Sequence, residues 1–216
     1  MDGDMNAASV HHDDVGRGPS QALRKGIIAI SIVFAVAFLF VADSYWISGS
    51  FMHEAIEWLG FDLILTCIFG RTWSTLFIGG RKNTALVESG PYSVSRNPLY
   101  VFSIIGATGV GAQFGSVTVA LVCGFFAWAV LLWTAWREEA SLLAAFGEDY
   151  RRYIVRVPRF MPNFSLWHSP DILTVQPRMI TVTFLDAVIF LIAIPIAKLF
   201  EYLHDIHVLP VYFTVP

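Results

Sequence analysis

Side chains that could carry out chemistry are concentrated in one short segment of an otherwise apolar chain. Segment 90–100, which lies between two hydrophobic runs, contains Tyr92, Arg96, Asn97 and Tyr100. All four side chains can donate hydrogen bonds, and a helix starting after them would add exposed backbone amides that favour a negative group. This combination favours binding of a ligand carboxylate. Anchoring of the tyrosines and the arginine to lipid headgroups is the alternative that these residues leave open.

A pair of carboxylates further along the chain is the second candidate. Glu138 and Glu139 follow a hydrophobic run and come directly after Arg137. Neighbouring residues on a helix point in different directions, so one acid can face a cavity while the other faces water or Arg137. A carboxylate at this place could bind a ribose or a cationic centre. A solvated helix end at a membrane surface is the equally simple alternative.

The elements that position these residues must be membrane helices. The chain has 216 residues, of which 56% are hydrophobic and only 14% are charged, and its mean hydropathy is +0.60. Soluble domains carry about a quarter charged residues, so the composition predicts an integral membrane protein. The formal net charge is −3 and no basic cluster stands outside the loops, which argues against a nucleic-acid partner. Neither cysteine has metal-ligand spacing, and we expect no metal.

Hydrophobic runs predict an all-α bundle with about five transmembrane helices. The expected spans cover residues 26–47, 56–78, 99–114, 116–136 and 180–203. Because only Gly115 separates the third span from the fourth, these two should form a tight helical hairpin. Pro195 should kink the last span. Residues 1–22 are expected to be a disordered tail, and residues 23–216 to form one transmembrane domain.

Basic residues and aromatic residues predict the orientation of this bundle. Lys and Arg occur before the first span, after the second, and between the fourth and fifth. Cytoplasmic loops carry an excess of these residues, so the N-terminus, segment 90–100 and Glu138 should be cytoplasmic. The loop near His53 and Glu57 should then face the other side. Segment 148–162 mixes arginines with aromatic residues and is expected to cap the site, or alternatively to adhere to anionic headgroups.

The motifs taken together resemble the isoprenylcysteine carboxyl methyltransferase family over about residues 56–163. The resemblance rests on Leu86-Val87, Gly90-Pro91-Tyr92, Arg96 to Tyr100, Glu138-Glu139, Phe146 to Tyr150, Tyr153 and Val157-Pro158-Arg159. It implies an integral membrane methyltransferase that binds S-adenosyl-L-methionine at the cytoplasmic face. Its other partners would be the lipid bilayer and a small lipophilic substrate.

The resemblance also implies roles for individual residues. Leu86 and Val87 would contact the adenine through their backbone, and Glu138 would hydrogen-bond the cofactor. The methionine and ribose end would be lined by Tyr92, Asn97, Pro98, Leu99 and Tyr100. No catalytic residue is identified, and Arg96, Asn97 and Arg137 are the candidates for positioning.

Two departures from the family pattern bear on the substrate. Asn97 stands where the family usually has histidine, and an amide can donate a hydrogen bond but cannot act as a base. Thr134 stands where enzymes acting on prenylated proteins carry an arginine for the substrate carboxylate. A carboxylate acceptor needs no base, so a small lipophilic acid is the expected acceptor. The alternatives are N-methylation of a phospholipid amine and a non-catalytic membrane scaffold or transport accessory.

Overall fold

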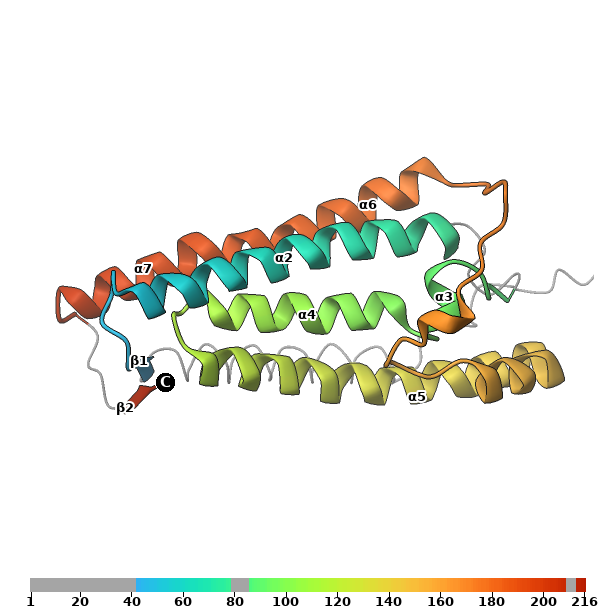
Figure 1. The fold of residues 1–216 in the computed structure, drawn as a ribbon, viewed down its shortest axis with the longest axis horizontal. Helices are drawn as coiled ribbons and strands as arrows, with labels where there is room; N and C mark the ends of the chain where they lie inside the picture. The colour runs from blue at the N-terminus through green and yellow to red at the C-terminus, as the bar shows by residue number, and fades with distance from the viewer. Residues whose placement is uncertain (1–41, 79–85, 209–212) are drawn as a thin grey trace, which may run out of the picture.

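Four long rods of helix lie side by side in a computed structural model that describes residues 42–78, 86–208 and 213–216 (Figure 1). The rods are α2 (Phe51–Ile78), α4 (Pro98–Ala112), α5 (Val117–Arg156), and a C-terminal rod made of α6 (Pro177–Val188), the 3-10 turn η2 (Ile189–Ile192) and α7 (Ala193–Asp205). α2 packs between α4 and α6, and α4 packs between α2 and α5. The all-α prediction is confirmed apart from two very short strands.

Helix length and composition agree with a membrane setting. Among the described residues, three helices are long and apolar enough to cross a bilayer, namely α2, α5 and the rod from Pro177 to Asp205. α4 is apolar but shorter, with 15 residues. The predicted tail 1–22 and residues 26–41 of the predicted first span lie outside the described residues.

The end of the predicted first span is not helical. β1 (Ala42–Ser44) pairs in parallel with β2 (Phe213–Val215), so that Ser44 lies opposite Val215. The ladder continues with a hydrogen bond of 2.9 Å from the Tyr45 amide to the Val215 carbonyl. Aspartate and serine are weak helix formers, and pairing with the C-terminus satisfies the backbone groups of Ala42 to Ser44 instead. The hydrophobic run alone did not reveal this partner.

The predicted helical hairpin is formed by α4 and α5. Ser116 caps the start of α5, because its hydroxyl oxygen accepts a hydrogen bond of 3.2 Å from the Val119 amide. On its other side α4 packs closely against α2, because both helices are glycine-bearing at the contact. A Cβ added to Gly109 would lie 2.7 Å from the Gly60 carbonyl oxygen, so a side chain there would push the helices apart.

Two helices differ in length or regularity from a simple span. α5 extends well past the predicted end at Trp136 and continues to Arg156, with non-helical angles at Gly147 (φ 53°, ψ −120°). The C-terminal rod changes to a 3-10 turn over Ile189–Ile192, directly before α7 begins at Ala193. Pro195 lies within the first turn of α7, where the N–H that proline lacks is not needed, and the kink stays a prediction. The extra length of α5 carries half of the candidate site.

Candidate active site

The segment 86–97, called the loop below, leads into α4 and contains a short helix that fixes its shape. α3 (Pro91–Val94) begins after Gly90, which has φ 60°. A Cβ at Gly90 would lie 2.2 Å from the ring of Phe77, so both the backbone angle and the space favour glycine. Pro98 then forms the first turn of α4, as its position in the sequence predicts. The loop therefore enters α4 in one defined direction.

A segment that follows α5 covers this loop as the predicted cap. The amide of Arg96 donates to the Pro158 carbonyl at 2.9 Å, and the amide of Asn163 donates to the Val94 carbonyl at 2.9 Å. The side chain of Asn97 donates from Nδ2 to the Arg159 carbonyl at 3.2 Å. In all three hydrogen bonds the cap contributes backbone groups, so they hold the cap in place whatever its side chains are. The short 3-10 turn η1 (Phe164–Leu166) continues the cap near α3.

A cavity of about 300 Å³ lies between the loop, α4 and α5. Its lining contains Leu86, Val87, Tyr92, Asn97, Leu99, Tyr100 and Glu138, together with Arg96. The sequence-predicted residues are thus brought to one place, although they come from three separate elements. Pro98 is an exception among them: it is buried at the start of α4 and does not line the cavity. Cavities that bind small molecules have volumes from about 300 Å³ upward.

Glu138 is joined to Tyr100 across the helical hairpin. The Tyr100 hydroxyl donates to Oε2 of Glu138 over 2.6 Å. An O–H group bonded to a carboxylate at this distance is a strong, charge-assisted hydrogen bond. It connects the first turns of α4 with the middle of α5. The carboxylate is therefore held at a fixed place in the cavity wall.

Glu139 faces two arginines, and the expectation that the second acid would meet water or Arg137 is wrong. Arg159 donates to Glu139 from Nε at 2.9 Å and from Nη2 at 2.8 Å, in a two-pronged contact. Nη1 of Arg96 lies 3.1 Å from Oε1 of the same carboxylate. The Glu139 side chain is 11% exposed, and the hydrogen bond to it raises the pKa of Arg159, so this guanidinium stays charged. This cluster ties the loop, α5 and the cap together.

Arg137 lies outside the cavity. Its guanidinium sits over the ring of Trp133, 4.9 Å from the ring centroid. Such a contact is a cation–π interaction, and it directs the Arg137 guanidinium toward Trp133 of the same helix. Arg137 was a candidate for positioning a ligand, but it is not among the residues that line the cavity.

Tyr92 brings a buried hydroxyl to the cavity wall. The side chain is 5% exposed, and its oxygen has no hydrogen-bond partner among the described residues. Burial raises the pKa of Tyr92, so the phenol stays protonated and can donate. A buried polar atom without a partner costs free energy unless something binds it. The hydroxyl is therefore a natural contact for a ligand.

Part of the lining was not identified from the sequence. It consists of Ser141, Leu142, Phe146, Tyr150 and Tyr153 of α5, with Ile78 of α2. The signal was present, because Glu139, Leu142, Phe146 and Tyr150 recur at helical spacing and share one face. Tyr153, on the next turn, donates to the Tyr92 carbonyl at 2.7 Å. Extending α5 past its hydrophobic run would have found this face.

Comparisons with known proteins cover most of the chain. The phospholipid methyltransferase family matches residues 58–149. The cobalt-zinc-cadmium resistance protein CzcN of Cupriavidus metallidurans is 33% identical over 186 residues, covering 86% of this chain and 85% of that protein. The nickel-cobalt-cadmium resistance protein NccN of Alcaligenes xylosoxydans xylosoxydans is 32% identical over 168 residues, which is 78% of each chain.

A eukaryotic enzyme matches a shorter part. The protein-S-isoprenylcysteine O-methyltransferase of Schizosaccharomyces pombe is 31% identical over 94 residues, which cover 43% of this chain and 40% of that enzyme. No solved structure gives a significant match. The family match contains the loop, the hairpin and both glutamates of the candidate site. This chain therefore belongs to the phospholipid methyltransferase family, which is related to the isoprenylcysteine methyltransferases, and is a relative of CzcN and NccN.

Proposed function

We propose that this chain is an integral membrane methyltransferase that uses S-adenosyl-L-methionine and acts on a small lipophilic acceptor. The observation that carries the proposal is the cavity beside the Tyr100–Glu138 hydrogen bond. The family match and the partial similarity to an isoprenylcysteine methyltransferase support methyl transfer as the chemistry. The excess of basic residues on the loops supports a cytoplasmic position for this cavity.

The residues around the cavity suit such a cofactor. Leu86 and Val87 offer apolar contacts and backbone groups for an adenine, and Glu138 can accept hydrogen bonds from hydroxyl or ammonium groups. The Tyr92 hydroxyl, which has no partner among the described residues, can donate to a carboxylate. Apolar, acidic and donor groups therefore occur together in a space of suitable volume.

The protein groups would act by orientation and by exclusion of water. When bound, the cofactor supplies an electrophilic methyl group on a sulfonium. Tyr100 fixes the Glu138 carboxylate, and the Arg96–Glu139–Arg159 cluster holds the cap over the loop. Holding two reacting groups in a dry cavity can supply most of the rate of a simple displacement. No proton transfer is needed when the acceptor is already a carboxylate.

A carboxylate acceptor is our first choice and a phospholipid amine is the second. The side chains that line the cavity contain no histidine or lysine, and Glu138 and Glu139 are both engaged, among the residues that the structure describes. An amine would need a base to remove its proton, so this lining favours an acid. The family description, phospholipid methyltransferase, is the observation that favours the amine.

The names of two relatives suggest a biological setting. CzcN is named as a cobalt-zinc-cadmium resistance protein and NccN as a nickel-cobalt-cadmium resistance protein, and the similarity covers most of this chain. We therefore propose that methylation by this protein contributes to metal tolerance. Complementation of a deletion strain should restore growth on cobalt or zinc with the wild-type chain and fail with Glu138→Gln. Equal rescue by both chains would leave tolerance without a link to methyl transfer.

Transfer of a labelled methyl group tests activity and acceptor together. Membranes containing the chain are incubated with methyl-labelled S-adenosylmethionine, and the lipid extract is treated with base. Base-labile label indicates an ester and base-stable label indicates a methylated amine. Glu138→Gln should abolish the label, while Glu148→Gln, an exposed acid on the same helix, should not. Cofactor binding without any labelled product would favour the non-catalytic scaffold or transport accessory.

A further inference from the structure

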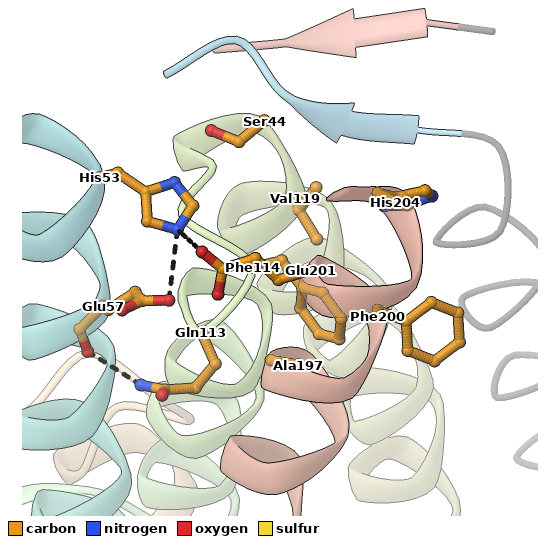
Figure 2. A pocket seen from close by; sticks show the side chains of 10 residues that line it. All are labelled: Ser44, His53, Glu57, Gln113, Phe114, Val119, Ala197, Phe200, Glu201 and His204. Carbon is orange, nitrogen blue, oxygen red and sulfur yellow. Dashed lines mark hydrogen bonds and ion pairs between the residues drawn. The ribbon is translucent and has the colours of Figure 1, made fainter. Parts of the chain in front are cut away.

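A second polar cluster lies at the opposite end of the bundle from the methyltransferase cavity. It joins the first turns of α2 to the end of α7, near the strand pair (Figures 1 and 2). Nε2 of His53 lies 3.3 Å from Oε1 of Glu57 and 3.6 Å from Oε1 of Glu201. The two glutamates come from helices that are far apart in sequence. Three potential metal ligands thus converge on one point, and their ligand atoms all lie within 4.8 Å of one another.

The histidine of this cluster is deeply buried. Its side chain is 5% exposed, and neither ring nitrogen has a hydrogen-bond partner among the described residues. Figure 2 shows its ring pointing toward both carboxylates. A buried imidazole without a hydrogen bond is costly, and a ligand on Nε2 would remove that cost. Burial and direction together make His53 the central residue of the cluster.

The ring is held in this direction by the α4–α5 turn. A Cβ added to Gly115 would lie 2.1 Å from Cε1 of His53, so the turn packs directly against the imidazole. The Ser44 hydroxyl donates to the Gly115 carbonyl at 2.8 Å, and this hydrogen bond attaches the α4–α5 turn to β1. Gln113 donates from Nε2 to the Glu57 carbonyl at 2.8 Å and anchors the neighbouring helix. The position of Nε2 is therefore set by three elements.

The spacing of the ligand atoms agrees with a tetrahedral metal. Zinc bonds to histidine nitrogen and carboxylate oxygen at about 2.0–2.2 Å, which places neighbouring ligand atoms about 3.3–3.6 Å apart at tetrahedral angles. The two distances from His53 fall in this range. The cavity between the residues measures about 20 Å³, which is room for one water as a further ligand. Calcium and magnesium prefer oxygen ligands throughout, whereas imidazole suits transition metals.

We propose that His53, Glu57 and Glu201 form a binding site for one divalent transition-metal cation such as Zn²⁺. The imidazole and one oxygen from each carboxylate are the protein ligands. The site is separate from the methyltransferase cavity and does not depend on the proposed methyl transfer. It links the beginning of α2 to the end of α7, so bound metal also stabilises the packing of these helices.

Lys198 neutralises part of the charge of the two carboxylates in the absence of a metal. Its ammonium lies 2.6 Å from Oε1 of Glu57 and 2.8 Å from Oε2 of Glu201. The Lys198 side chain is 52% exposed, so it can turn outward when a cation binds. Two carboxylates and one ammonium leave a net negative charge, which attracts a divalent cation. The lysine is therefore a competitor of the metal and not a ligand.

Metal titration of the purified protein tests this site. The full-length chain is placed in lipid nanodiscs without a polyhistidine tag, with His11→Ala and His12→Ala so that the N-terminal pair contributes nothing. Isothermal titration with Zn²⁺ should show one ion per chain, and Co²⁺ should give the visible absorption of a tetrahedral nitrogen and oxygen site. Glu57→Gln and Glu201→Gln should each weaken binding at least about tenfold.

Two further variants separate a metal site from a simple ion-pair cluster. Glu54→Gln, one turn before Glu57 on the exposed side of α2, should leave metal affinity unchanged. Lys198→Met should keep or tighten Zn²⁺ binding, although it breaks the ion pairs. Loss of binding in Lys198→Met would overturn the proposal. The proposal is also overturned if the protein that carries only His11→Ala and His12→Ala does not bind one ion per chain, a result that does not depend on the folding of any site variant. It is overturned as well if Glu57→Gln and Glu201→Gln both bind Zn²⁺ as tightly as that protein.

Discussion

Tyr100 and Glu138 meet over 2.6 Å, although one side chain comes from the start of α4 and the other from the middle of α5. The contact closes one wall of the candidate cofactor cavity and crosses the helical hairpin. It also links two motifs of the family resemblance that are 38 residues apart in the sequence. The order of the site therefore depends on the packing of α4 against α5.

Loss of the Tyr100 hydroxyl should free the Glu138 carboxylate from its hydrogen bond, while the aromatic ring at position 100 stays in the cavity wall. Tyr100→Phe removes a hydrogen bond to a charged group, a contact that contributes about 1.5–3 kcal/mol. We expect affinity for S-adenosylhomocysteine to fall by about tenfold or more, because 1.4 kcal/mol corresponds to tenfold. Isothermal titration measures the change. Tyr202→Phe, the same change at an exposed tyrosine of α7, should have no such effect, and equal affinity in Tyr100→Phe would contradict the role given to this bond.

Tyr92→Phe should weaken cofactor binding without lowering the stability of the ligand-free protein. The hydroxyl has no hydrogen-bond partner among the described residues, so removing it should not lower the melting temperature of the ligand-free protein. Affinity for S-adenosylhomocysteine should nevertheless fall, because the ligand would lose a donor. Thermal unfolding with and without ligand measures both effects. A drop in the stability of the free protein would mean that Tyr92 has another partner.

The sequence predicted the helical hairpin and the cluster of segment 90–100 with Glu138 because both depend on local pattern. A run broken only by Gly115 indicates two antiparallel helices, and the family resemblance grouped segment 90–100 with Glu138. Contacts between remote segments could not be predicted in this way. The pairing of Ser44 with Val215 and the approach of Glu201 to His53 join opposite ends of the chain, and neither leaves a periodic signal.

Breaking the Glu139 cluster should destabilise the protein strongly. Glu139→Gln leaves Arg96 and Arg159 without their carboxylate in a largely buried place, and loss of one partner of a buried ion pair costs about 3–5 kcal/mol. The melting temperature of the purified protein should fall clearly. Asp149→Asn is the matched control, because its pair with Arg152 is exposed and should contribute little. A similar melting temperature for both variants would show that the cap does not depend on Glu139.

Arg137 should be dispensable for cofactor binding. Its guanidinium lies over Trp133 and outside the cavity, whereas Arg96 lines the cavity and contacts Glu139. Arg137→Ala should therefore keep its affinity for S-adenosylhomocysteine, and Arg96→Ala should weaken it. The two titrations are compared in the same lipid. A larger loss in Arg137→Ala would restore the positioning role that the sequence suggested.

Binding of S-adenosylhomocysteine to the purified wild-type chain and to Glu138→Ala tests the cavity most directly. Isothermal titration in lipid nanodiscs should show one saturable site for the wild type and at least about tenfold weaker binding for Glu138→Ala, with both proteins equally folded. Glu148→Ala, an exposed acid beyond the cavity, should behave as the wild type. Absence of saturable binding to the wild type, or binding that Glu138→Ala leaves unchanged, would contradict a cofactor site between the loop and α5.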